Sequence, residues 1–162
     1  MSNPFTEGSA VSAALLRWWK GLEDDRGAGA ELRRCHSLLD VMLTPAFQAV
    51  RQRLIEAGLK PRASDEDRLA AIIGLAAHLK EAGDQEPAPA FSEGERPAVS
   101  PLRFRQILDA RDDEELFHRL RRVLPLVEHL GLSKLARDVF NWDEATRKRW
   151  VYGYRWPQKQ SA

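Results

Sequence analysis

The spacing of apolar residues is the feature that most limits what this chain can fold into. Along almost the whole sequence they recur every three or four residues, which places them on one side of an α-helix. The clearest case is the series Leu69, Ile72, Ile73, Ala76 and Leu79. No stretch alternates apolar and polar residues in the way that a half-buried β-strand does. The sequence therefore predicts an all-α fold, a compact helical bundle.

Residues that begin helices support the same prediction. Thr44 and Ser100 can each accept a hydrogen bond from a free N–H of the first turn, and each is followed by proline, which suits the first helical position. Asp112 and Asp143 are expected to cap later helices, where negative charge also matches the helix dipole. Further caps are expected at Ser12, Ser64 and Ser133.

A proline-rich segment interrupts the helical pattern between residues 84 and 99. Its prolines, its glycine and its polar composition are typical of a mobile surface connection. We therefore expect two small helical lobes joined by this loop. The N-terminal lobe would cover residues 1–83, the linker 84–99, and a basic C-terminal lobe 100–162.

Composition excludes several classes of protein. The chain has 162 residues, of which 43% are hydrophobic and 30% charged, so it can bury a core and is not a disordered tail. It has no apolar run of the roughly 18 residues that a membrane helix needs, and its first residues lack the layout of a signal peptide. We expect a cytoplasmic protein with no membrane contact.

The sequence gives little support to an enzyme. No two of the four histidines are four residues apart, as paired metal ligands on a helix would be, and no glycine-rich phosphate loop or Gly-x-Ser-x-Gly motif is present. The single cysteine, Cys35, lies on an apolar stripe and is expected to be a buried structural thiol. We therefore expect no catalytic residue, no metal and no cofactor. The five tryptophans are expected mainly to pack in the core rather than to stack on bases.

Charge is distributed unevenly along the chain. The total is +1, but residues 116–162 contain ten Lys and Arg against four Asp and Glu, so this stretch carries +6 and the rest carries −5. The N–H donors of a guanidinium group lie in one plane and match the spacing of phosphate oxygens. Such contacts hold a nucleic-acid backbone without recognising its base sequence. Each basic cluster is also typical of a solvated helix face with local salt bridges. Their joint bias to the second half is compatible with one basic groove for an anionic partner.

Several of these features follow one another in a definite order. They are Trp18-Trp19, Leu32-Arg33-Arg34, Pro45-x-Phe47, Ser100 with Arg103-Phe104, Ile107-Leu108, Leu120-Arg121-Arg122, Trp142, and the basic-aromatic stretch from Arg147 to Tyr154. This order resembles the CasB family, the small subunit of Cascade, the type I-E CRISPR surveillance complex. The resemblance covers nearly the whole chain and is most specific from Ser100 onward, whereas residues 84–99 give no match.

The resemblance implies a non-catalytic, all-helical subunit that holds nucleic acid without sequence preference. Such subunits stabilise the R-loop by holding the displaced DNA strand and bracing the target strand. The implied partners are the backbone and large subunits of Cascade, the guide RNA, the target and displaced DNA, and a second copy of the chain. The implied phosphate contacts are Arg33, Arg34, Arg103, Arg105, Arg111, Arg119, Arg121, Arg122, Arg147, Lys148 and Arg149. The alternative is a structural helical adaptor whose arginines contact acidic protein surfaces and never meet nucleic acid.

Overall fold

The prediction of an all-α fold is confirmed. The computed structural model describes residues 3–158, and within that range every regular element is helical. The α-helices are α1 (Ala10–Gly21), α2 (Arg26–Arg33), α3 (Leu38–Met42), α4 (Pro45–Glu56), α5 (Glu66–Ala76), α6 (Pro87–Phe91), α7 (Pro101–Leu108), α8 (Asp113–Val123), α9 (Leu132–Phe140) and α10 (Glu144–Gly153). Single 3-10 turns follow α1, precede α5 and follow α8, at Leu22–Asp24, Ala63–Asp65 and Leu124–Leu126.

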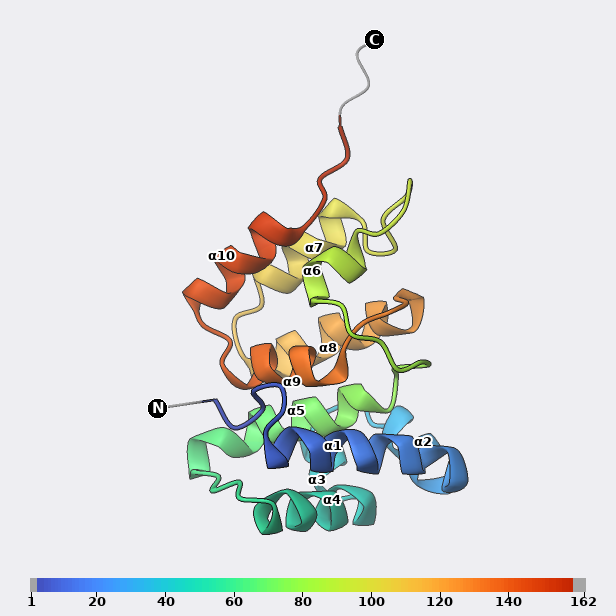
Figure 1. The fold of residues 1–162 in the computed structure, drawn as a ribbon, viewed down its shortest axis with the longest axis vertical. Coiled ribbons are helices and arrows are strands. Elements are labelled where there is room, and N and C mark those ends of the chain that lie inside the picture. Colours follow the sequence, from blue (N-terminus) through green and yellow to red (C-terminus); the bar gives the residue numbers. More distant parts are fainter. Residues whose placement is uncertain (1–2, 159–162) are drawn as a thin grey trace.

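Helix α5 lies in the middle of the molecule. Figure 1 shows α1 to α4 at one end of the long axis, α6, α7 and α10 at the other, and α5 with α8 and α9 between them. Every residue of α5 from Leu69 to Ala76 is buried, because the helix packs against α3 on one side and against α8 and α9 on the others. Gly74 permits this packing, since a β-carbon there would lie 2.9 Å from Phe117 and from Val41.

The two predicted lobes share apolar contacts. The buried apolar side chains form one cluster that runs from Phe5 to Tyr154, and α5 from the first predicted lobe packs on α8 and α9 from the second. The boundaries at residues 83 and 100 stay a prediction. Residues 1–2 and 159–162 of the predicted lobes lie outside the described residues.

The segment predicted as a mobile polar linker contains a buried helix, so that part of the prediction is wrong. Pro87, Ala88, Ala90 and Phe91 of α6 are all buried. The Phe91 ring meets the Trp150 ring of α10 edge to face, with centroids 5.5 Å apart. The prolines misled the prediction, since Pro87 sits in the first turn of α6, where its missing N–H costs nothing.

The predicted caps at Thr44, Ser100, Asp112 and Asp143 are confirmed. Each side chain accepts a hydrogen bond from the backbone N–H three residues later, at 3.0, 3.3, 2.8 and 2.8 Å respectively. These caps satisfy N–H groups that the first turn leaves free. They fix the entry points of α4, α7, α8 and α10.

The other predicted caps are wrong. Ser9 caps α1 instead of Ser12, and Gly131 occupies the cap position of α9 instead of Ser133. Ser12 and Ser133 lie inside their helices, and the Ser12 hydroxyl donates to the Ser133 hydroxyl at 2.5 Å, which joins α1 to α9. Ser64 lies within the 3-10 turn before α5. A hydroxyl can cap a helix or join two helices, and local sequence does not distinguish these uses.

Candidate nucleic-acid interface

The structure brings together predicted cations from α2 and α8. Arg33 and Arg34 lie at the end of α2, and Arg121 and Arg122 lie in the last turn of α8. The Arg121 Nη2 donates to the backbone carbonyl of Arg33 at 3.0 Å, and the Arg33 Nη1 donates to the carbonyl of Ala77 at 3.3 Å. Residues 88 positions apart in the sequence therefore form one group, which we call the α2–α8 basic junction.

His78 lies inside this junction and responds to its charge. Burial lowers the pKa of His78 to about 4, and the positive charges of Arg121 and Arg33 act in the same direction. The imidazole is therefore neutral at pH 7. It lines a cavity of about 930 Å³ whose walls also include Trp19, Arg33 and Lys80. Charges of both signs line this cavity, since Arg26, Arg33 and Lys80 share its walls with Glu23 and Asp24.

We expect His78→Gln to reduce the acid sensitivity of the fold. The ordinary histidine pKa of 6.5 applies to the unfolded chain, and the folded value is about 4, so the unfolded state binds more protons between these values. Stability that is present above pH 6.5 is lost as the pH falls toward 4. The full difference between the two pKa values corresponds to about 3 kcal/mol of unfolding free energy. Water reaches the half-buried ring and screens its charge, so we expect a loss of about 2 kcal/mol.

Urea unfolding of the wild type and of His78→Gln at several pH values between 7 and 4 measures this loss. The exposed His36 provides the matched control, and His36→Gln should keep the wild-type pH dependence. Equal pH dependence in the wild type and the His78 variant would contradict the burial argument.

A second group of predicted cations lies on α7 and the adjoining face of α8. Arg103 and Arg105 are exposed on either side of Phe104, which is fully buried and so directs its neighbours outward. Arg111 is exposed just beyond α7. Arg119 of α8 donates to the backbone carbonyl of Gln106, which joins α8 to α7 next to Arg105. Arg103, Arg105 and Arg111 therefore lie on or just after α7, and the contact of Arg119 joins this helix to α8.

Helix α10 carries the third group, and its members differ in their contacts. The Phe104 ring of α7 stacks on the Tyr154 ring just beyond α10, with centroids 4.2 Å apart, which holds α10 against α7. Lys148 pairs with Glu144 at 3.1 Å on the exposed face. The Arg149 guanidinium lies against Asp138 at 2.5 Å and Glu86 at 3.3 Å. Carboxylates of the chain itself therefore hold Arg149.

The predicted cations fall into two sets, those with a carboxylate partner and those without one. Arg119, Lys148 and Arg149 have carboxylate partners. Within residues 3–158 no carboxylate pairs with the others, which are Arg33, Arg34, Arg103, Arg105, Arg111, Arg121, Arg122 and Arg147. Lys159, part of the basic C-terminal stretch, lies outside the described residues. The unpaired cations come from α2, α7, α8 and α10 and from the residues that follow α2 and α7.

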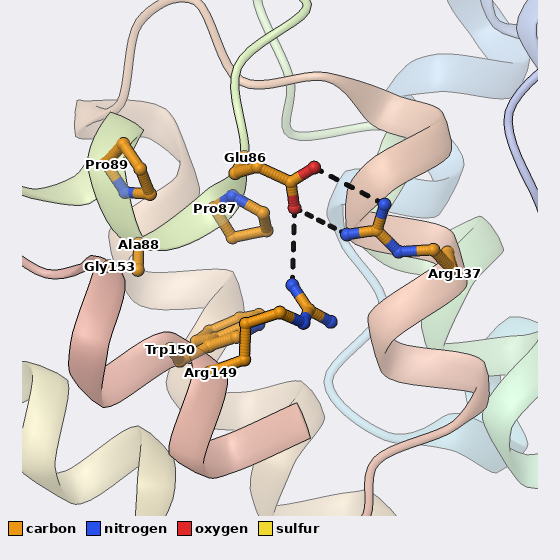
Figure 2. Close-up of a pocket in the computed structure, with 8 residues that line it drawn as sticks. All are labelled: Glu86, Pro87, Ala88, Pro89, Arg137, Arg149, Trp150 and Gly153. Atoms are coloured by element: carbon orange, nitrogen blue, oxygen red, sulfur yellow. Dashed lines mark hydrogen bonds and ion pairs between the residues drawn. The ribbon is translucent and has the colours of Figure 1, made fainter. Parts of the chain in front are cut away.

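One ionic cluster around Asp138 was not predicted from the sequence. Asp138 of α9 is only 1% exposed and accepts hydrogen bonds from Arg137, Arg149 and the indole N–H of Trp150. Arg137 also binds Glu86 at 2.5 Å, as Figure 2 shows. Burial alone would lower the pKa of Arg137, but its hydrogen bonds to Glu86 and Asp138 raise it overall. A signal existed in the sequence, because Asp138 lies three residues after Leu135 on the apolar face of α9.

The aromatic and thiol side chains serve mainly in packing, as predicted. Trp150 is 1% and Trp18 8% exposed, and the partly buried Trp19 donates its indole N–H to the Ala76 carbonyl at 2.9 Å. Cys35 is buried, and burial raises the pKa of its thiol, so it is a poor nucleophile at pH 7. In the described part of the chain no three His, Cys, Asp or Glu side chains are grouped to hold a metal ion. None of the helices within residues 3–158 has both the length and the apolar character to cross a bilayer.

Comparison with known structures supports the fold. A chain in the crystal structure of E. coli Cascade bound to a PAM-containing double-stranded DNA target superimposes with a TM-score of 0.65 and 23% sequence identity. The match covers 88% of this chain and 92% of that chain. Among curated proteins none gives a significant sequence match.

Comparison with family models gives the relationship directly. The model of the CRISPR-associated protein Cse2 matches residues 28–154, which is most of the chain and includes every predicted contact residue. The resemblance to the small subunit of Cascade that the sequence suggested is thereby confirmed. The chain belongs to the CRISPR-associated Cse2 family.

Proposed function

We propose that this chain is a non-catalytic subunit of a Cascade complex that holds nucleic acid by its sugar-phosphate backbone and so stabilises the R-loop. Its partners in this proposal are the backbone and large subunits, the guide RNA, and the target and displaced DNA strands. A second copy of the chain would extend the same surface. Family membership and the likeness to a chain of DNA-bound Cascade support the assembly.

The α2–α8 basic junction is the observation that carries the nucleic-acid part of the proposal. Arg121 is hydrogen-bonded to the Arg33 carbonyl, so cations from distant parts of the chain present their charge together. Within residues 3–158 no carboxylate forms an ion pair with Arg33, Arg34, Arg121 or Arg122. Unpaired guanidinium groups on rigid helices are suited to phosphate oxygens.

Contacts of this kind meet the physical need of an R-loop. Pairing of a guide with its target exchanges one duplex for another of similar stability, so modest contacts with the displaced strand can decide the balance. Each guide specifies another target, which makes sequence-independent contacts with phosphates the useful ones. The net charge of +1 predicts weak binding by the isolated chain, and assembly raises the effective concentration of the strand.

The double variant Arg34→Glu, Arg122→Glu tests the proposal. Both side chains are exposed, so their reversal should leave the helical circular dichroism spectrum unchanged. Losing two phosphate contacts should lower the slope of log K against log salt by about 1.4 and weaken binding of mixed-sequence single-stranded DNA by about tenfold or more. Fluorescence anisotropy over a salt series measures both. Retention of the R-loop in reconstituted Cascade should fall in parallel.

The matched control is the double variant Arg53→Glu, Lys60→Glu, which makes the same change of charge on exposed residues of α4 and the loop after it. It should bind DNA almost as well as the wild type. Equal weakening by both double variants would show that net charge alone governs binding and would contradict a localised interface. Absence of DNA binding by the wild type, alone and in Cascade, would leave the structural adaptor as the function.

A further inference from the structure

Glu86 occupies a position between two arginines that a phosphate group could take. Its carboxylate lies 2.5 Å from Arg137 of α9 and 3.3 Å from Arg149 of α10, and Figure 2 shows both guanidinium groups directed at it. Two guanidinium groups that converge on one pair of oxygens from different helices form the geometry in which phosphates are bound.

The two carboxylates of this cluster differ in accessibility. Asp138 is 1% exposed and is held by both arginines and by Trp150, whereas the side chain of Glu86 is 39% exposed. Asp138 is therefore the fixed partner and Glu86 the exchangeable one. Arg137 holds both oxygens of Glu86 and Arg149 holds one, so the contacts that a phosphate makes must offset the loss of these bonds when Glu86 is released. Without Glu86 the cluster has one positive charge in excess.

The surroundings of Glu86 offer room for a larger ligand. A cavity of about 430 Å³ adjoins the carboxylate, within the range of about 300 to 1,000 Å³ typical of small-molecule sites. Pro87, Pro89 and Gly153 line it together with Arg137 and Arg149 (Figure 2). Apolar walls beside two guanidinium groups suit a phosphodiester whose sugar rests on the prolines.

We propose that Arg137 and Arg149 form a phosphodiester site that Glu86 occupies in the free protein and vacates when a nucleic-acid strand binds. This inference rests on the proposed function for the identity of the strand. It explains why Arg149, a predicted phosphate contact, is paired in the free chain. Glu86 then acts as an internal competitor. It limits the binding of nucleic acid outside the complex, until the complex brings a strand close to the site.

Glu86→Gln tests the proposal, with Glu56→Gln as the matched control. Glu56 is exposed on α4, which lies at the end of the long axis away from α6 and α10, and its variant makes the same change of charge. Glu86→Gln should bind mixed-sequence single-stranded DNA roughly three- to fivefold more tightly than Glu56→Gln, with a slope of log K against log salt steeper by about 0.7. Circular dichroism checks that both variants are folded.

A second measurement does not depend on DNA binding. The indole N–H of Trp150 donates to Asp138 at 2.8 Å, so its NMR signal, assigned with Trp150→Phe, responds to changes at Arg149. Inorganic pyrophosphate should shift this signal at lower concentration in Glu86→Gln than in the wild type.

The two measurements separate the hypotheses. Equal DNA affinity and slope for the Glu86 and Glu56 variants, or a Trp150 signal that pyrophosphate does not move in Glu86→Gln, would overturn the phosphodiester site. A signal that moves in a protein that binds no DNA would support the anion site and contradict the proposed function. DNA binding that is unaffected by Glu86→Gln would leave the proposed function standing without this site.

Discussion

Replacing Asp138 by alanine is expected to lower the free energy of unfolding by about 3 kcal/mol. The carboxylate is buried and accepts from Arg137 at 2.9 Å, from Arg149 at 2.5 Å and from Trp150 at 2.8 Å. Its removal leaves the indole N–H of Trp150 without an acceptor and leaves Glu86 as the remaining carboxylate partner of Arg137 and Arg149. The arginines retain some contact with water, which places the loss at the lower end of the range for broken buried ion pairs.

Denaturant unfolding measures this loss, and Glu144→Gln is the control. Glu144 pairs with Lys148 on the exposed face of α10, and loss of that pair should cost less than about 1 kcal/mol. An Asp138→Ala variant as stable as the Glu144 variant would show that the cluster does not hold α9 and α10 together.

Trp150→Ala should have a larger effect than Asp138→Ala and lower the free energy of unfolding by about 4 kcal/mol. The ring is 1% exposed and lies at the centre of an aromatic cluster, with centroids 4.7 Å from Trp142 and 5.5 Å from Phe91. Truncation removes apolar surface and leaves a cavity that the rigid rings of α6 and α7 cannot fill. Because α10 depends on this cluster, its cations should lose their fixed position as well.

Tyr152 provides the control for Trp150, since it is an aromatic residue of the same helix that is 87% exposed. Tyr152→Ala should change stability by no more than about 0.5 kcal/mol. Thermal unfolding of both variants makes the comparison. Similar losses in the two would mean that the aromatic cluster is not the anchor of α10.

The helices could be predicted because their signals are local. A cap such as Thr44 or Asp143 bonds to an N–H three residues away, and a proline after the cap reinforces it. Gly83 shows where local signals fail. A glycine soon after an apolar series such as Leu69 to Leu79 is typical of a helix C-terminus, but α5 ends at Ala76. Gly83 instead permits a close crossing, since a β-carbon on it would lie 2.1 Å from the carbonyl carbon of His129. The requirement for glycine comes from a segment remote in sequence.

The candidate site was predictable to a similar extent. Residue type and order along the chain identified the cations, since guanidinium chemistry and the family resemblance both depend on sequence alone. Their pairing was not predictable. The contact of Arg149 with Glu86 spans 63 positions, and that of Arg121 with the Arg33 carbonyl spans 88. The packing of the helices determines which arginines stay unpaired. Only the three-dimensional structure shows this packing.

The burial of α5 on all sides has a consequence for how the chain can be divided. Its residues from Leu69 to Ala76 have no face toward water, because α3 covers one side and α8 and α9 the others. A cut in the proline-rich segment would leave α5 with α3 on one fragment and would put α8 and α9, which cover its other sides, on the other fragment. Each fragment would then expose apolar surface and aggregate. We expect soluble protein only when the two fragments are produced together.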